Sequence, residues 1–275
     1  MRSTNELRFL MCPPHHFGVE YVINPWMQGQ VNAADQKLAW KQWMQFHGLM
    51  TSYADVALMP AVSGLPDLVF TANAALVSNR TAVLSSFRCR ERQPEARYYA
   101  DWLAADGFQV ETLPSGVLFE GAGDALFDRG TKPMLWFGYG FRSSASALPY
   151  LQRSCEVEVQ GLRLWDPRFY HLDTCFCPLD GGYLLYYPAG FDAQSNANIE
   201  SRFPCDKRFA VTEQEAIHFA CNAVNIGKTI ILNYATPELT ERLNSRGFEV
   251  IQTPVSEFMK AGGSTKCLSL RLNEC

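Results

Sequence analysis

The sequence lacks any long basic segment and any long hydrophobic segment. Its 275 residues carry 24 Lys and Arg against 28 Asp and Glu, a formal net charge of −4, so nothing favours nucleic-acid binding. Near the N-terminus the apolar patch covers only residues 9–12, and no stretch approaches the roughly 18 apolar residues of a membrane-spanning helix. We therefore expect a soluble cytoplasmic protein that binds neither nucleic acid nor membrane.

The sequence also lacks the motifs of a metal or phosphate site. Its nine cysteines are scattered, with no C-x-x-C pair and no Cys/His cluster at zinc-ligand spacing. Cys175 and Cys177 stand on an expected strand, where both would face one side and be poorly placed to bridge. We predict no metal and no cofactor, and we expect most cysteines to be small buried side chains in a reducing compartment.

Short strands alternate with amphipathic helices along the whole chain. Residues 31–54 predict a helix with Trp40, Trp43, Met44, His47 and Met50 spaced to form one face. Residues 66–77 predict a strand, a tight turn and a second strand. A helix over 97–107 is followed by a strand over 108–114, and the same phrase returns at 236–247 and 248–254, which indicates a repeated unit. With no linker in the sequence, we predict one α/β domain spanning residues 1–275.

One segment near the C-terminus raises a specific question. Residues 262–272 read GGSTKCLSLRL, a glycine pair followed by alternating apolar and polar residues. The pair predicts a sharp turn, and the alternation predicts a strand from Cys267 to Leu272. Cys267 is then either a core residue or a nucleophile presented at the edge of a strand.

Acidic and amide side chains stand in two further segments. Asp67 and Asn73 flank an apolar run in LPDLVFTANAALV, where an Asp after Pro is also a common turn residue. Glu120 and Asp124 lie in FEGAGDALF, a glycine-rich turn between hydrophobic residues. Carboxylates in apolar surroundings need partners, although a solvated turn explains the pattern equally well.

A histidine and an arginine complete the set. His171 and Asp173 alternate with apolar residues in an expected strand, which would direct both to the same face. Arg142 follows Gly138 and Gly140, and an arginine on such a loop suits a carboxylate ligand, although an arginine in this setting is more commonly a surface residue. A thiol with a histidine is suited to covalent catalysis, while acids and arginines together fit a free amino acid with a cationic side chain, such as arginine.

The ordered segments MCPPHHFGVEYVINPWM, LPDLVFTANAALV, FEGAGDALF, GYGFR, HLDTCF and AGGSTKC resemble the guanidino-group-modifying superfamily of arginine deiminases, dimethylargininases and amidinotransferases. The wording INPWM, FTAN and GGxxKC is most similar to the catalytic domain of arginine dihydrolases. This resemblance covers nearly the whole chain. It implies a five-bladed α/β propeller, the pentein fold, built of ββαβ units with the active site at the central channel. It also implies that the chain, which stops at Cys275, lacks the C-terminal extension of the cyanobacterial dihydrolases.

The resemblance also implies roles for individual residues. Cys267 would be the nucleophile, His171 the general acid and base, and Glu120 a contact of the guanidinium that also orients the histidine. Asp173 and Asp67 would belong to the guanidinium pocket. The substrate carboxylate and amino group would be held by three further residues, Arg92, Arg142 and Asn24.

Asn73 stands where deiminases and dimethylargininases have an acid. Because an amide can donate a hydrogen bond to a ureido oxygen, citrulline could stay bound and react again. We therefore expect an arginine dihydrolase that yields ornithine, ammonia and CO2. The alternatives are a deiminase that yields citrulline, a hydrolase of methylated arginines, a non-catalytic arginine-binding protein and a cysteine peptidase. Homo-oligomer formation is left open.

Overall fold

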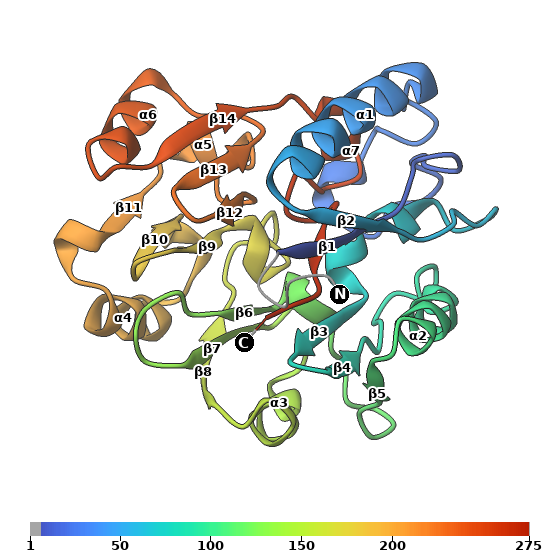
Figure 1. Cartoon of the computed structure of the whole chain (residues 1–275), viewed down its shortest axis with the longest axis horizontal. Helices are drawn as coiled ribbons and strands as arrows, with labels where there is room; N and C mark the ends of the chain where they lie inside the picture. Colours follow the sequence, from blue (N-terminus) through green and yellow to red (C-terminus); the bar gives the residue numbers. More distant parts are fainter. Residues whose placement is uncertain (1–6, 275) are drawn as a thin grey trace.

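The computed structural model describes residues 7–274, which contain five three-stranded sheets around a common centre (Figure 1). In each sheet the middle strand pairs antiparallel with one neighbour and parallel with the other. Four sheets follow chain order: β3 (Ala75–Ser78), β4 (Thr81–Leu84) and β5 (Gln109–Glu111); β6 (Ala125–Phe127), β7 (Met134–Tyr139) and β8 (Glu158–Arg163); β9 (Phe176–Leu179), β10 (Tyr183–Tyr186) and β11 (Arg208–Ala210); β12 (Val224–Ile226), β13 (Thr229–Leu232) and β14 (Glu249–Gln252).

The fifth sheet joins the two ends of the described chain. Its strands are β15 (Leu270–Arg271), β1 (Arg8–Met11) and β2 (Asp55–Leu58), with Phe9 opposite Arg271 and Leu10 opposite Leu270. The last strand of the sequence therefore supplies the first strand of the blade that the N-terminal segment completes. This pairing closes the ring.

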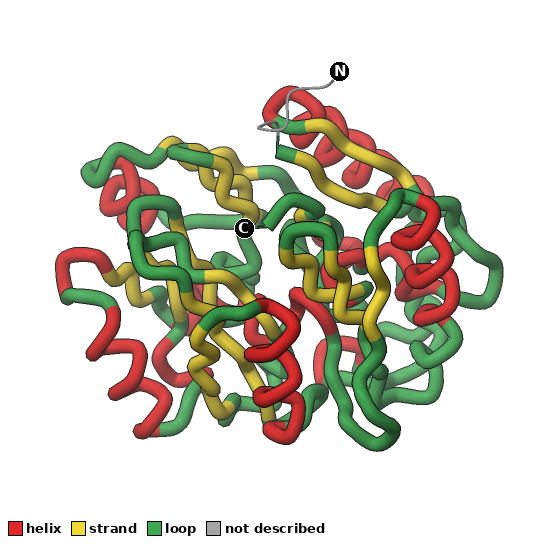
Figure 2. The backbone as a smooth tube through the Cα atoms, turned by 60° about the horizontal axis from the view of Figure 1, so that its bottom comes forward, coloured by secondary structure: helices red, strands yellow, loops and turns green. Residues whose placement is uncertain are grey.

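A helix connects the two parallel strands of every blade, as a parallel crossover requires. These helices are α1 (Gln36–Tyr53), α2 (Glu95–Ala105), α3 (Leu148–Cys155), α4 (Ala193–Arg202) and α6 (Pro237–Asn244). They lie on the outside, with the strands inside (Figure 2). Two short helices, α5 (Glu213–Ile217) and α7 (Ser256–Met259), lie in the connections. The predicted five-bladed propeller of ββαβ units is confirmed.

The helix predicted over residues 31–54 begins later than expected. Asp35 caps α1 by accepting hydrogen bonds from the backbone N–H groups of Lys37 and Leu38, so the helix starts at Gln36. Trp40, Trp43 and His47 stack along one face as predicted, but this face is only partly buried, because Trp40 is 39% exposed and Met44 47% exposed. Ala39, Gln42 and Phe46 are buried alongside Trp43 and Met50 instead.

The predicted strands around the candidate site residues are only partly right. The first strand predicted within residues 66–77 is replaced by two 3-10 turns, η2 (Pro66–Val69) and η3 (Thr71–Asn73), whereas the second is present as β3. A further turn, η6 (Leu172–Thr174), follows His171, where a strand was predicted. Cys267 likewise lies in a turn, and its strand β15 starts only at Leu270. In each case local hydrogen bonds, such as Thr174 N–H to the carbonyl of His171, replace sheet pairing where the chain enters a blade.

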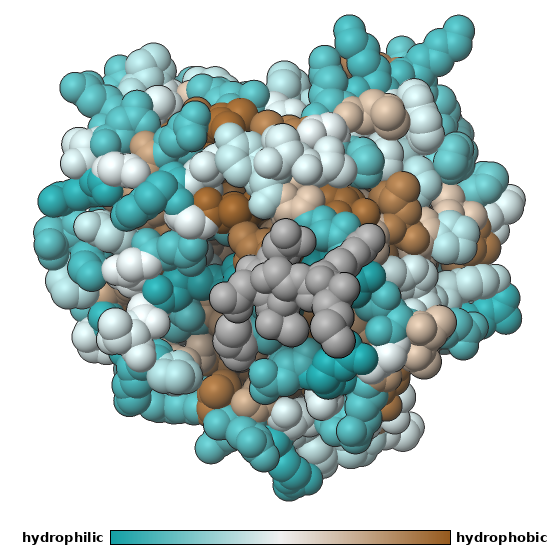
Figure 3. All heavy atoms as spheres, in the orientation of Figure 1, coloured by the Kyte–Doolittle hydropathy of each residue, from teal (hydrophilic) through white to brown (hydrophobic). Residues whose placement is uncertain are grey.

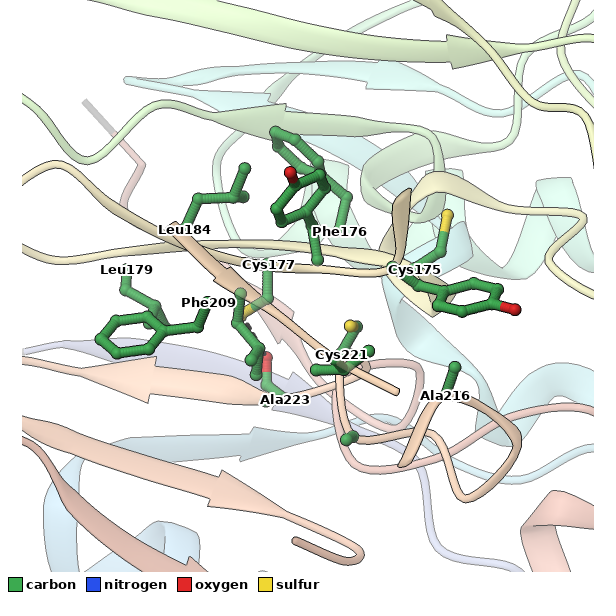
Figure 4. Packing of buried hydrophobic residues seen from close by; sticks show 14 of the residues in the cluster. Cys175, Phe176, Cys177, Leu179, Leu184, Phe209, Ala216, Cys221 and Ala223 are labelled. Carbon is green, nitrogen blue, oxygen red and sulfur yellow. Dashed lines mark hydrogen bonds between the residues drawn. The ribbon is translucent and has the colours of Figure 1, made fainter. Parts of the chain in front are cut away.

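Most cysteines pack as small apolar side chains, as predicted. All eight cysteines among residues 7–274 are free, and six of them are buried; Cys275 lies outside the described residues. Figure 4 shows Cys177 and Cys221 among Phe176, Leu184 and other apolar side chains of one core cluster. On the face drawn in Figure 3, hydrophobic groups are small and separated by hydrophilic ones. Within residues 7–274 no helix combines the length and hydrophobicity needed to cross a bilayer.

Gly138 provides a test of the packing behind the site. A Cβ atom at this position in β7 would lie 2.7 Å from the Cβ of Leu172, the neighbour of His171. We expect Gly138→Ala to lower the free energy of unfolding by about 1–3 kcal/mol, measured by urea denaturation. Gly48→Ala in α1 is the control, because a Cβ atom there would meet nothing within 4 Å. This variant should raise the free energy of unfolding by about 0.5–1 kcal/mol. Equal losses in the two variants would contradict this packing.

Candidate active site

The candidate site is built from the turns that lead into the first strand of each blade. Asn73 ends η3 before β3, Glu120 precedes η4 (Gly121–Gly123) before β6, and His171 precedes η6 before β9. Cys267 lies in the turn before β15. Gly262 has φ +84°, and a Cβ on Gly263 would lie 2.4 Å from the ring of Phe70. The glycine pair therefore forms the sharp turn that the sequence predicted.

Most of the predicted site residues line one small cavity. It is bordered by Ile23, Asn24, Met27, Asp67, Phe70, Asn73, Arg92, Arg142, Tyr170, His171, Ala261, Gly262, Gly263 and Cys267. Glu120 and Asp173 lie directly behind this wall, against His171 and Cys267 respectively. The structure thus brings together all nine residues that the sequence singled out, and all nine are buried.

Cys267 is held between an amide and a carboxylate. Its Sγ lies 3.1 Å from Asn222 Nδ2 and 3.7 and 3.8 Å from the two carboxylate oxygens of Asp173. Burial and then the Asp173 charge raise the pKa of the thiol well above its usual value. Burial also raises the pKa of Asp173 to about 7, with Lys266 opposing the shift. These shifts favour the protonated thiol of Cys267 at neutral pH.

His171 is paired with Glu120 across two blades. Its Nε2 lies 2.7 Å from Glu120 Oε2, the same oxygen that accepts a hydrogen bond from Arg142 Nη1 at 3.0 Å. Burial lowers the pKa of His171 to about 4, although Glu120 opposes the shift. Burial also acts to raise the pKa of Glu120, but Arg142 and then the His171 hydrogen bond outweigh it and hold that pKa far below its usual range. Near neutral pH this pair is a neutral imidazole beside an ionised carboxylate.

A second buried charge network surrounds Asp67. Arg92 donates to both carboxylate oxygens of Glu95, at 2.9 and 2.8 Å, and to Asn73 Oδ1 at 2.9 Å. Tyr21 donates to Asp67 Oδ2 at 2.9 Å, whereas the buried Oδ1 of Asp67 has no hydrogen-bond partner among the described residues. A buried carboxylate oxygen without a donor is costly unless a ligand supplies one. This oxygen suits a cationic N–H donor.

Asn24 and Arg142 hold the wall of the cavity together. Asn24 Oδ1 accepts from the backbone N–H groups of Trp26 and Met27, and its Nδ2 donates to the carbonyl of Ala261 at 3.0 Å. Arg142 Nη2 donates to the carbonyl of Ile23 at 2.9 Å. Both side chains thus fasten the segment around residues 23–27 over the site in addition to lining it.

Sequence reasoning missed two residues that organise the site. Glu95 neutralises Arg92 from the first turn of α2, and no sequence signal distinguished it from a surface acid at a helix start. Asn222 contacts the sulfur of Cys267, and here a signal exists. The segment Phe219–Ala223 (FACNA) repeats the F-x-x-N-A pattern of Phe70–Ala74 (FTANA).

Within residues 7–274 no three His, Cys, Asp or Glu side chains gather closely enough to hold a metal ion. A thiol, an imidazole–carboxylate pair and an unpartnered carboxylate oxygen meet at one cavity, which suits nucleophilic attack on a cationic carbon centre. Together with the five-bladed fold, this arrangement defines a member of the guanidino-group-modifying superfamily.

Comparison with known proteins identifies the family. Residues 14–273 match the model of the family described as N,N dimethylarginine dimethylhydrolase, eukaryotic, and the chain belongs to this family. It is 52% identical over 98% of its length to the bifunctional arginine dihydrolase/ornithine cyclodeaminase ArgZ of Synechocystis sp., covering 38% of that protein. It is 35% identical over 99% of its length to N(G),N(G)-dimethylarginine dimethylaminohydrolase of Mycobacterium tuberculosis, covering 88% of that protein.

A solved structure shows the same fold at high similarity. The N-terminal domain of ArgZ, determined as a cysteine-to-serine variant bound to its substrate, superposes with a TM-score of 0.96. The match covers 98% of this chain and 99% of that domain at 52% identity. The present chain therefore spans about two fifths of the full-length bifunctional relative and corresponds to its N-terminal domain.

The contact between Cys267 and Asp173 generates a pH prediction. Asp173→Asn removes the negative charge that disfavours the thiolate, so the midpoint for ionisation of Cys267 should fall by about one pH unit or more. The measurement is the pH dependence of iodoacetamide alkylation, followed on the peptide that contains Cys267, with Cys267→Ser as the blank. A midpoint that stays in place or rises would show that the carboxylate does not act on the sulfur.

Proposed function

We propose that the protein is a cysteine-dependent hydrolase of free L-arginine that removes the guanidino group in two rounds, giving ornithine, ammonia and CO2. The observation that carries this proposal is the convergence of Cys267, the His171–Glu120 pair and the unpartnered Asp67 oxygen on one cavity. The 52% identity to a bifunctional arginine dihydrolase across 98% of the chain supports the same substrate. The proposed catalytic unit is the whole chain, and it needs no cofactor.

Substrate binding divides the cavity by charge. Asp67 and Asp173 would accept hydrogen bonds from the guanidinium N–H groups, which fixes its plane against the sulfur of Cys267. Arg92 and Arg142 would face the substrate carboxylate and Asn24 its amino end, since all three line the cavity.

The first round begins when the positive charge of the bound substrate lowers the pKa of the Cys267 thiol. A guanidinium beside Cys267 offsets the repulsion from Asp173 and lowers the pKa of the thiol. The sulfur then bonds to the guanidinium carbon, and the thiol proton passes through His171 to the departing nitrogen, which leaves as ammonia. The product is a thiouronium bound to Cys267. His171 next takes a proton from water, the hydroxide adds to the same carbon, and cleavage of the C–S bond releases citrulline.

The second round depends on how citrulline is held. Asn73 Oδ1 is occupied by Arg92, while its Nδ2 makes only a long contact, 3.4 Å, with the backbone carbonyl of Glu120. That amide is thus available to donate to a ureido oxygen at the cavity wall. Cys267 would attack the ureido carbon and expel the second ammonia, and water would then release a carbamate that loses CO2 to give ornithine.

A second candidate function is hydrolysis of methylated arginines. The family model and the 35% identical mycobacterial relative favour it. Both functions use the same nucleophile and the same His171–Glu120 pair. They differ in the leaving group, which is ammonia in one and a methylamine in the other. Simple deimination of arginine to citrulline would use the first round alone.

Asn73→Asp separates one round from two. The carboxylate would keep the contact with Arg92 but could no longer donate to the ureido oxygen, so citrulline should accumulate and ornithine fall. Losing one buried hydrogen bond costs about 1–3 kcal/mol, roughly 5- to 150-fold in partitioning between the products. The measurement is the time course of citrulline and ornithine from arginine with both proteins.

The unsubstituted protein is its own control in that experiment. If it yields only citrulline, the dihydrolase proposal is wrong and deimination replaces it. If it ignores arginine and releases a methylamine from methylated arginine, the second candidate replaces it. If Asn73→Asp still yields only ornithine, a residue other than Asn73 determines whether the second round occurs.

A further inference from the structure

We propose that Asn222 positions Cys267 and stabilises its sulfur anion through a direct hydrogen bond from the side-chain amide. The inference rests on the proposed function only in taking Cys267 as the nucleophile. Asn222 is fully buried, and its side chain faces the sulfur across the turn before β15. No other amide side chain of the described residues has a hydrogen bond to this sulfur.

Backbone groups fix the orientation of the Asn222 amide. The N–H of Cys267 points at one end of the side chain, 3.2 Å away, and requires an acceptor there, so that end is Oδ1. The carbonyl of Asp173 lies 3.0 Å from the other end and requires a donor, so that end is Nδ2. With both ends assigned by the main chain, the remaining N–H of Nδ2 is directed at Sγ, 3.1 Å away.

The charges around the sulfur explain why an amide is suited to this position. Burial and then Asp173 disfavour the thiolate, while a backbone hydrogen bond from Ser264, the Asn222 amide and the neighbouring Lys266 favour it. His171 and Tyr170 line the same cavity as Cys267. A cation in contact with the sulfur would stabilise the thiolate but repel a guanidinium substrate. A neutral N–H donor stabilises the anion without that repulsion, and a hydrogen bond to an ionised partner is about twice as strong as a neutral one.

The ammonium of Lys266 is kept away from the substrate. Its side chain borders a second cavity, which is lined by strand residues such as Val77, Leu126 and Pro178 and not by the site residues. Lys266 therefore stabilises the Cys267 thiolate only at longer range, from the side of the second cavity. Asn222 is thus the side-chain donor in direct contact with the reacting atom, alongside a backbone hydrogen bond from Ser264.

Asn222 also occupies the position in its blade that Asn73 occupies in another. Each asparagine donates its backbone N–H to the carbonyl of a phenylalanine three residues earlier, Phe219 or Phe70, at 3.0 and 3.1 Å. Each stands two residues before the first strand of its blade, β12 or β3. The same turn thus places one amide against the nucleophile and another at the cavity wall.

The test is the pH dependence of Cys267 alkylation in Asn222→Asp. This change keeps the size of the side chain and the acceptor for the Cys267 N–H, but it replaces the donor with an oxygen. The ionisation midpoint should rise by about one to two pH units, which is about 10- to 100-fold less thiolate at a fixed lower pH. Alkylation by iodoacetamide is followed on the Cys267 peptide without arginine, so absence of arginine turnover would not affect the result.

Thr265→Val is the matched control. The Thr265 hydroxyl donates to the backbone carbonyl of Asn222 at 2.7 Å, so its loss disturbs the same turn without touching the amide donor. Its midpoint should equal that of the unsubstituted protein. An unchanged midpoint in folded Asn222→Asp, or an equal rise in Thr265→Val, would overturn the proposal.

Two further measurements cover the case in which Asn222→Asp does not fold. Asn222→Ala removes the donor without adding a charge, and its midpoint should also rise. In the unsubstituted protein labelled with 15N-asparagine, one side-chain NH2 signal should shift with the Cys267 midpoint and stay fixed in Cys267→Ser. If no asparagine side-chain signal follows that midpoint, the proposal is wrong.

Discussion

The buried carboxylate of Glu120 is the interaction on which the geometry of the site depends. One of its oxygens accepts from both His171 and Arg142, and the other accepts from the backbone N–H of Arg88 at 3.1 Å. An ionised carboxylate with no exposure is tolerated only when such donors surround it. Because the donors come from different blades, satisfying this one charge fixes the imidazole and the guanidinium relative to each other.

Closure of the ring brings Cys267 into the site. Cys267 enters the cavity only because β15 pairs with β1, which brings the end of the sequence beside its beginning. The turns before β3, β9 and β12 then meet the turn before β15, so Asn73, Asp173 and Asn222 reach the same centre as the thiol. A repeated turn in five blades thus produces a constellation whose members are far apart in sequence.

The repeated helix–glycine–strand phrase predicted a repeated unit, and the family resemblance carried by the ordered motifs implied the blade and the residues that gather in the cavity. Their local structure was not predictable in the same way. Residues 171–173 and 267–272 alternate in polarity like strands, but His171 precedes a 3-10 turn and Cys267 lies in a turn, with a strand only at Leu270–Arg271. Partners such as Glu95 and Asn222 were missed because burial of a polar side chain follows from tertiary contacts, which no local pattern records.

The central claim is that Cys267 bonds covalently to the guanidino carbon. It is tested most directly by mixing the protein with arginine labelled with 13C in the guanidino group, quenching in acid and locating the label by peptide mass spectrometry. The account predicts label on the peptide that contains Cys267 during turnover, and neither label nor product with Cys267→Ser. Turnover without label on that peptide, or product formation by Cys267→Ser at the rate of the unsubstituted protein, would contradict it.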